Sequence, residues 1–419
     1  MAVVAPVVVV TTFLMSLDLT VPDSRAFRWL ITILVVVPIT VMAFIWKQYG
    51  LYLLLGTIAF FKVLMNQGVV SNSILFLLIF VIGLAFSLRP TKVNNIPGRN
   101  AYFLLVIAFL LQSVRALDFV EAINSILGML SVAIMFYVVA PRLRQREARY
   151  AVLAYLIGAF LFGVMALSGY DWSIMGRLGE GIELNPNNIA LYMSTMLIIS
   201  VYLIVTERRI SMLLLLSVVV ATFVLVLTGS RTFLVASTIG LLFFLRSKYA
   251  LVAAALVLGV LLVTIVASAW AEWPLITHIS KGLFSDNLVT LEGISTKRWE
   301  LLMVGLRIFY DHPIVGIGLG NFAEAAHVYH GEKTLIAHDL YLSIAAELGV
   351  FALLILVCWN LSLLLRSFRG NNNLAFSLTI MYCIVGMLSG NYLDPEYAVI
   401  WAIAFALVRE SRQRGLTGC

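Results

Sequence analysis

Ionisable residues that could support group-transfer chemistry lie in the polar connections between long apolar runs. His338 and Asp339 close the one long polar stretch, 271–339, directly before a further apolar segment. An imidazole has a reference pKa of about 6.5, so it can accept a proton at neutral pH. A histidine where a polar loop enters an apolar segment is therefore the first candidate for a general base.

Three arginines lie in connections that we assign below to the same side as His338. They are Arg177, Arg231 and Arg298. A guanidinium group stays charged and binds phosphate oxygens through two parallel hydrogen bonds. Each arginine alone is typical of an ordinary surface, but cations from three separate connections indicate a site for an anion. Residues that we predict to support this site are Arg307, Asp339 and Glu347.

Other kinds of site are disfavoured. His327, His330 and His338 suggest a zinc site, but no fourth ligand stands at a suitable interval. Gly316-Ile-Gly-Leu-Gly320 resembles a phosphate-binding loop, but it follows no strand and opens no dinucleotide-binding unit. The connections assigned to this side contain no Asp-x-Asp sequence, which disfavours a metal-dependent transferase. We therefore expect no metal ion and no other cofactor.

The composition indicates a membrane protein. Apolar residues make up 62% of the 419 residues and charged residues 12%, which leaves too little polar surface for a water-soluble globule. The apolar runs lack the period-two alternation of a transmembrane barrel. We predict an all-α polytopic integral membrane protein, a bundle of about 12–14 transmembrane helices. The candidate segments are 2–17, 27–46, 50–66, 73–88, 101–117, 122–140, 151–169, 188–206, 211–228, 232–245, 250–270, 340–365, 374–390 and 397–409.

Charge asymmetry predicts the orientation. One set of connections carries 17 of the 28 basic and 3 of the 21 acidic residues, a net charge of +14, whereas the remaining positions sum to −7. The positive-inside rule makes the basic set cytoplasmic, together with both termini. The connections that carry His338 and the three arginines then face the opposite compartment. The basic set comprises Lys47, 89–99, 142–149, 207–209, 246–248, 366–369 and the C-terminal tail.

The chain divides into three predicted regions. Residues 1–270 form transmembrane helices with short loops. Residues 271–339 form one large extracytoplasmic loop with amphipathic helices. Residues 340–419 form C-terminal transmembrane helices and the cytoplasmic tail. The last region begins with one helix over about 340–365, which places His338 at its outer mouth.

Two helices are predicted within the large loop. The first begins with Ser295 or Thr296 as its N-cap and ends before Pro313. Its apolar stripe favours packing against the membrane domain, although a position at the lipid interface fits the same pattern. The second helix spans 321–331. The stripe of the first helix consists of Trp299, Leu302, Leu306 and Phe309.

Four segments of the second half, taken in order, carry a family resemblance. They are Leu227-Thr-Gly-Ser-Arg-Thr232, Thr296 to Phe309, His312-Pro-Ile-Val-Gly-Ile-Gly-Leu-Gly-Asn-Phe322 and His338 to Gly349. Their order and spacing resemble the O-antigen ligase family of bacterial inner membranes. The resemblance extends over 177–365, and the first 170 residues are similar only in being hydrophobic.

The resemblance implies a GT-C-like glycosyltransferase of lipopolysaccharide biosynthesis in the bacterial inner (plasma) membrane, with its active face in the periplasm. The donor would be a glycan on undecaprenyl pyrophosphate and the acceptor lipid A-core, with membrane lipids around them and no nucleic acid. His338 matches the family's essential histidine, and Arg231 and Arg298 match its essential arginines. Asp339 stands where many members have asparagine. We expect metal-independent, inverting transfer with His338 as general base.

Alternative functions stay open. An O-antigen polymerase or a protein O-oligosaccharyltransferase of the same superfamily differs only in its acceptor. A transporter or flippase of lipid-linked glycans belongs to another class and predicts ionisable residues deep in the helices and repeated halves. Only Lys62 and Arg115 are basic residues placed partly within exported helix ends, so the sequence favours the enzyme.

Overall fold

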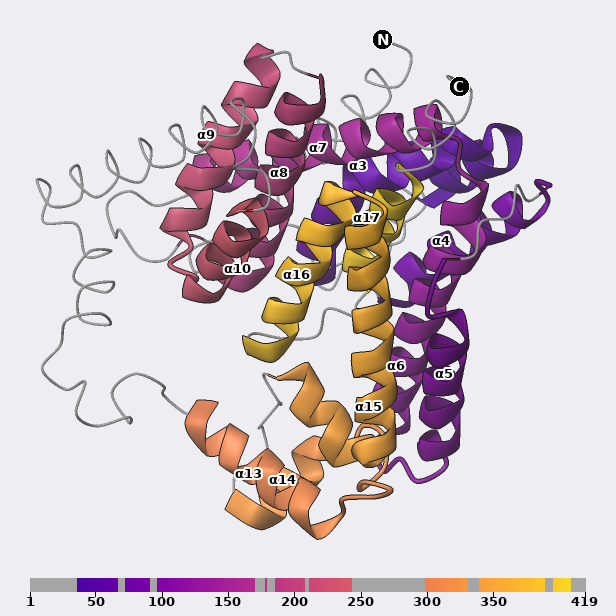
Figure 1. Cartoon of the computed structure of the whole chain (residues 1–419), viewed down its shortest axis with the longest axis vertical. Coiled ribbons are helices and arrows are strands. Elements are labelled where there is room, and N and C mark those ends of the chain that lie inside the picture. The colour runs from indigo at the N-terminus through magenta and orange to yellow at the C-terminus, as the bar shows by residue number, and fades with distance from the viewer. Residues whose placement is uncertain are drawn as a thin grey trace, which may run out of the picture.

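The computed structural model is helical throughout the residues that it describes. These are 36–66, 72–90, 96–169, 178, 185–207, 211–242, 298–330, 339–388 and 395–407. Every predicted apolar segment that falls within these ranges carries a helix, which confirms an all-α polytopic membrane protein (Figure 1). The predicted segments 2–17 and 250–270 lie outside the described residues.

The helices follow the predicted order. Their bounds are α3 (Lys47–Asn66), α4 (Asn72–Ser87), α5 (Arg99–Ser113), α6 (Phe119–Ala133) with η1 (Ile134–Val139) and η2 (Ala140–Arg142), α7 (Gln145–Ser168), α8 (Pro186–Glu207), α9 (Met212–Leu227), α10 (Arg231–Leu242), α13 (Arg298–Asp311), α14 (Phe322–His330), α15 (Leu340–Arg369), α16 (Asn373–Leu388) and α17 (Pro395–Ala406). Among the described helices, four are long and apolar enough to cross a membrane: Phe119–Arg142, Gln145–Ser168, Pro186–Glu207 and Leu340–Arg369.

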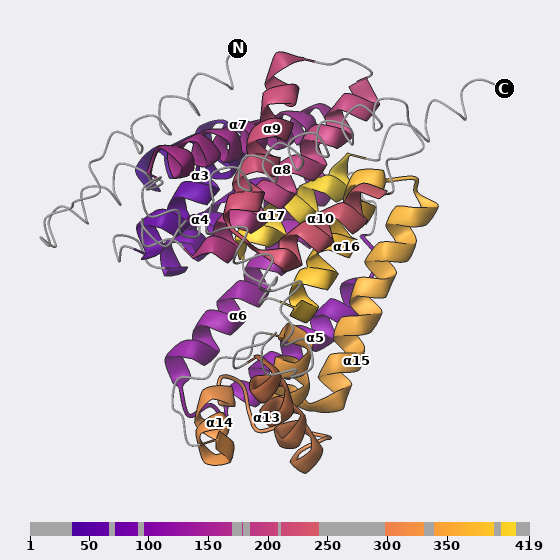
Figure 2. The ribbon, with the colours of Figure 1, turned by 90° about the vertical axis from the view of Figure 1, so that its left-hand side faces the viewer.

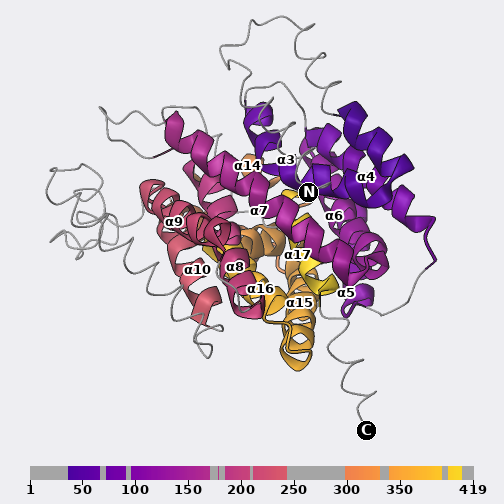
Figure 3. The same cartoon turned by 90° about the horizontal axis from the view of Figure 1, so that it is seen from above.

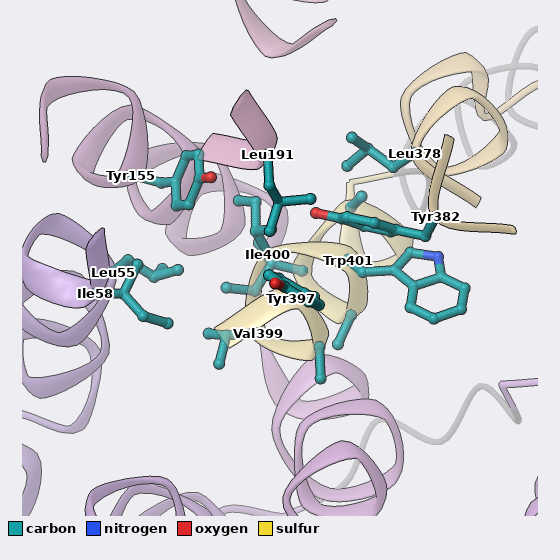
Figure 4. Packing of buried hydrophobic residues seen from close by; sticks show 14 of the residues in the cluster. Leu55, Ile58, Tyr155, Leu191, Leu378, Tyr382, Tyr397, Val399, Ile400 and Trp401 are labelled. Atoms are coloured by element: carbon teal, nitrogen blue, oxygen red, sulfur yellow. The ribbon is translucent and has the colours of Figure 1, made fainter. Parts of the chain in front are cut away.

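Helix α17 lies near the centre of the bundle when it is viewed from above (Figure 3). Residues of α3, α7, α8 and α16 surround its side chains (Figure 4). Trp401 is fully buried, with ring centroids 5.1 Å from Phe136 and 5.3 Å from Trp359. Its Nε1 donates to the Thr379 hydroxyl over 2.8 Å. The aromatic core is therefore apolar in its faces and hydrogen-bonded at its polar edge, as a water-free interior requires.

Contacts hold several of the predicted cytoplasmic connections together at one end of the bundle. Arg89 donates to both carboxylate oxygens of Glu147 over 3.1 and 2.9 Å. Arg149 forms an ion pair of 2.6 Å with Glu207, and Asn372 donates to the Ala404 carbonyl. The grouping of these connections thus agrees with the charge pattern, and their assignment to the cytoplasm stays a prediction.

Helix α15 is not the single straight helix expected over 340–365. Gly349 interrupts it with φ 81° and ψ 179°, a conformation outside the helical region. The Asn360 side-chain nitrogen donates to the Tyr341 hydroxyl over 3.1 Å, although 19 residues of straight helix would separate these positions by about 28 Å. The segment therefore forms a hairpin. We call 340–348 the short arm and 350–369 the long arm.

The glycine-rich turn, residues 312–321, satisfies the backbone groups that this break exposes. A continuous helix would join the Val350 amide to the Ala346 carbonyl. Instead the Val350 amide donates to the Pro313 carbonyl over 2.8 Å, and the Ala346 carbonyl accepts from Ile317 over 3.0 Å. Such pairing is obligatory where water is absent. Figures 1 and 2 show the resulting cluster, with α13 and α14 at the end where α5, α6 and α15 meet.

The loop helix predicted before Pro313 is confirmed as α13, but the predicted packing stripe is wrong. Its packed residues are Leu301, Val304 and Ile308, which form a small core with Phe322, Ala326 and Ala346. Leu302 and Phe309 are half-buried and Leu306 is 44% exposed. The side of α13 that is buried is the side that packs against the short arm. The sequence pattern gives no information about that neighbour. Ser295 and Thr296 lie outside the described residues, and only the backbone of Trp299 is described.

Gly349→Ala tests the hairpin. A Cβ at this position would overlap the Ile314 carbonyl oxygen, and the positive φ disfavours any L side chain. The strained backbone alone costs about 1–3 kcal/mol, so we expect a lower thermal unfolding midpoint in detergent, measured by circular dichroism. Gly163→Ala is the matched control, because its Cβ would meet only side-chain atoms of Val220 and Met193 at 3.0 and 3.1 Å. Equal midpoints for the two variants would contradict the hairpin.

Candidate functional site

Of the predicted site residues, two begin helices. Arg231 opens α10 and Arg298 opens α13, and only the backbone of each is described. His338 and Arg177 lie outside the described residues. Their neighbours Asp339 and Leu178 are described.

The predicted connections of Arg177 and Arg231 meet. Leu178 is fully buried, and its amide donates to the Leu227 carbonyl over 3.0 Å. The Ser230 hydroxyl donates to the Asn187 side-chain oxygen over 2.9 Å. The residues that flank both arginines in sequence are therefore fixed to one another on the side opposite the Arg89–Glu147 contact.

Side-chain contacts through α8 and α16 connect the first turn of α10 to the start of α15. The Ser194 hydroxyl of α8 donates to the Phe233 carbonyl, two residues after Arg231. The next residue of α8, Thr195, is 3.3 Å from the Tyr382 hydroxyl of α16. The next residue of α16, Cys383, is hydrogen-bonded to Tyr341, two residues after Asp339. Adjacent residues of α8 and α16 thus connect the two helix starts.

Helix α13 runs parallel to the short arm. A Cβ at Gly305 would lie 2.6 Å from Leu342 Cδ2, and Leu301 and Ile308 pack in one core with Ala346. Beyond the end of α13, the Ile317 amide reaches the Ala346 carbonyl. The beginning of α13, where Arg298 stands, therefore points to the same end as Asp339.

The arrangement can attract an anion. Helices α10, α13 and α15 each begin in this region, and the first amides of a helix have no acceptor within the helix. The helix dipole places a partial positive charge at such an end. Helix starts at Arg231, Arg298 and Asp339 combine this polarity with two positions that carry arginine.

Asp339 is the N-cap of α15. Its Oδ1 accepts from the Leu342 amide over 3.1 Å. Aspartate and asparagine are equally good N-caps. Burial raises the pKa of the Asp339 carboxyl above its ordinary value, and the backbone amides of Leu342 and Tyr341 oppose that shift. Asp339 thus orders the start of the short arm, directly after His338 in sequence.

The other two predicted supporting residues lie apart from these helix starts. Glu347 is buried near the hairpin bend, and its Oε1 accepts from the Phe322 amide at the start of α14 over 3.0 Å. A carboxylate is stabilised at this end of a helix, so Glu347 anchors α14 to the short arm. Arg307 is exposed on α13.

The glycine-rich turn uses its amides within the protein. The amides of Gly316, Ile317, Gly318 and Leu319 donate to the carbonyls of His312, Ala346, Glu347 and Gln112. Amides that are already paired cannot cradle a phosphate. The turn joins helices, in agreement with the sequence argument against a dinucleotide site.

Asn321 connects this turn to the α5–α6 connection. Its side chain accepts from the Leu117 amide over 2.7 Å and donates to the Arg115 carbonyl over 2.9 Å. Arg115 donates in turn to the Gly316 carbonyl over 3.2 Å. Arg115, which sequence reasoning weighed as a residue of a transport pathway, is exposed and joins two connections at the end of the bundle.

Metal-ligating residues do not gather in the part of the chain that is described, where no three of His, Cys, Asp and Glu come together. Of the three histidines considered for zinc, His338 lies outside that part and the side chain of His330 is not described. His327 is half-buried with its Nδ1 covered.

Three residues of this region were missed by sequence reasoning. Gly349, Asn360 and Tyr341 form and hold the hairpin. A glycine and an asparagine inside an otherwise apolar helix pattern are signals that the helix has a bend or a buried polar contact. The sequence could therefore have drawn attention to Gly349 and Asn360, but not to their partner Tyr341.

Residues 194–357 match the family model of the O-antigen ligases. This range contains most of α8, the α9–α10 turn, α13, α14 and the short arm. The predicted resemblance to the O-antigen ligase family is confirmed over these residues. No curated protein matches the chain by sequence.

Substitutions of Asp339 separate its capping role from its charge. Asp339→Ala removes the cap, so we expect a loss of about 1 kcal/mol in stability. Asp339→Asn keeps the cap. A raised folded-state pKa gives stability at low pH that is lost as the pH rises through that pKa. Asp339→Asn should therefore be at least as stable as wild type at neutral pH, with the difference vanishing in acid.

Thermal unfolding across pH measures both effects. Asp118→Ala is the matched control, since Asp118 caps α6 through the Val120 and Glu121 amides far from these helix starts. It should lose similar stability without loss of activity. An Asp339→Asn variant as unstable as Asp339→Ala would contradict the capping role.

Proposed function

We propose, on the premise that residues 194–357 match the O-antigen ligase family, that this protein is an O-antigen ligase. It transfers a glycan from undecaprenyl pyrophosphate to lipid A-core at the periplasmic face of the bacterial inner membrane. The observation that supports the proposal is that α10, α13 and the short arm, three helices of that range, each begin at or directly beside a residue of the proposed site. These helices begin at Arg231, at Arg298 and directly after Asp339.

The reaction is a direct displacement. The acceptor hydroxyl oxygen attacks the anomeric carbon from the face opposite the diphosphate, and the bond between that carbon and the phosphate oxygen breaks. The electron pair leaves with the diphosphate, and His338 takes the proton of the hydroxyl. One displacement inverts the anomeric configuration.

The developing charge on the diphosphate needs fixed cations. Arg231 and Arg298, with Arg177, would hold its oxygens, since guanidinium groups bind phosphate through paired hydrogen bonds. The amide ends of α10 and α13 add partial positive charge. No metal ion is assigned a part in this step.

A purified-protein assay tests the proposal. The protein in detergent is incubated with a polyprenyl-pyrophosphate glycan and separately with core-lipid, a second lipid-linked glycan or an acceptor protein, each with and without EDTA. We expect core-lipid to gain the mass of the glycan, equally in both arms. A gain by the second glycan or by the protein would name a polymerase or a protein transferase instead. Activity lost in EDTA and restored by a divalent ion would overturn the metal-independent mechanism.

Movement of the lipid-linked donor across the membrane without any transfer of its glycan would favour the transporter class over the enzyme class. If none of the acceptors gains mass and the protein in vesicles moves the lipid-linked glycan between leaflets, the protein is a flippase. That pair of results would refute the enzyme.

His338→Ala should abolish transfer, since no other group is assigned the proton. We expect a loss of at least about 100-fold in kcat, while donor binding, measured by thermal shift with the lipid-linked glycan, stays close to wild type. His327→Ala is the matched control, a histidine of α14 outside the proposed chemistry. Full activity of His338→Ala would remove the base assignment.

A further inference from the structure

The short arm is held by polar contacts at both of its ends. At the bend, Glu347 accepts from the Phe322 amide over 3.0 Å. At the start, the Tyr341 hydroxyl accepts from Asn360 of the long arm over 3.1 Å and is hydrogen-bonded to Cys383 of α16. One polar residue of the short arm thus contacts two different helices of the bundle.

Apolar packing alone does not orient the start of the short arm. Between its ends the arm contacts α13 through Leu342 and Ala346. Burial of apolar surface has no preferred direction, so such a contact by itself does not fix the orientation of the end that lies away from the bend. Hydrogen bonds are directional, and the one at Tyr341 fixes where the arm begins.

The polar groups of this contact are costly to place inside the bundle. Asn360 is 4% exposed and stands in the middle of the long arm, among residues that would cross the bilayer. Polar side chains at such positions are rare and mark functional regions. A leucine at position 360 could pack in the bundle but could not donate a hydrogen bond.

We propose that Tyr341 is a positioning residue for the glycan transfer. Its hydroxyl, held by Asn360 and Cys383, orients the start of the short arm, which follows Asp339 directly. This inference rests on the proposed function, which assigns the base to the residue that precedes Asp339 in sequence. Tyr341 acts through the arm.

Tyr341→Phe tests the inference, since it removes the hydroxyl and keeps the ring. We expect kcat to fall about tenfold, as the loss of one buried hydrogen bond predicts, with the KM for the donor within about twofold. Asn360→Leu should give the same split. The double variant should lose no more than Tyr341→Phe alone, because both substitutions remove the hydrogen bond between Tyr341 and Asn360.

Tyr102→Phe is the matched control. Tyr102 of α5 is fully buried, and its hydroxyl donates to the Met129 carbonyl over 2.8 Å. Loss of that hydroxyl should lower the unfolding midpoint and leave kcat within about twofold of wild type, because the contact lies outside the proposed chemistry. An equal fall of kcat in Tyr102→Phe and Tyr341→Phe would reduce the role of Tyr341 to general stability and overturn the inference.

A second readout does not depend on activity. In a background with Cys358 and Cys419 replaced by serine and Cys383 retained, Gly305→Cys and Leu342→Cys bring two thiols within disulfide reach. The crosslink should form readily and should form less when Tyr341→Phe is added. If the wild-type protein transfers no glycan but Tyr341→Phe still lowers crosslinking, the proposed function is refuted and the positioning role of Tyr341 is retained. Transfer with unchanged kcat and unchanged crosslinking in Tyr341→Phe overturns the inference.

Discussion

The requirement that every backbone polar group be paired away from water governs this structure. A helix meets it without help, but a chain that turns back inside a bundle does not. The break at Gly349 exposes the Ala346 and Glu347 carbonyls and the Val350 amide, and the glycine-rich turn pairs with all three. The hairpin and the turn therefore depend on one another. Neither could be retained if the other were lost.

This constraint links distant parts of the chain. The glycine-rich turn also accepts from Arg115 and binds the α5–α6 connection through Asn321. Glu347 adds α14 to the same cluster. Elements of the first and second halves of the chain are thus joined at one end of the bundle. The bend of the short arm is held there by residues that take no part in the proposed chemistry.

The contacts that hold the short arm also bear on the anion site proposed at the helix starts. Arg231 and Arg298 open helices, and Asp339 caps a third. A rigid frame that holds such ends together lowers the cost of assembling an anion site for each substrate. The contact of Tyr341 with Asn360 ties the short arm of this frame to the long arm.

Much of this architecture follows from the sequence because it depends on local composition. Apolar runs of sufficient length form helices in lipid whatever their partners are, and the charge of short connections orients them. The order of motifs around Arg231, Arg298 and His338 was enough to identify the family resemblance over 194–357. The N-cap at Asp339 likewise concerns residues close in sequence.

The tertiary structure alone decided the rest. The sequence predicted an unbroken helix over 340–365, because the residues on both sides of Gly349 are equally apolar. It predicted the wrong face of α13, because the partner of that face is an arm that the unbroken helix would not provide. The periodicity of a helix shows which of its sides is apolar, but it does not identify the element that packs against that side. The pairing of Tyr341 with Asn360 exists only after the chain has reversed, so no spacing in the sequence could announce it.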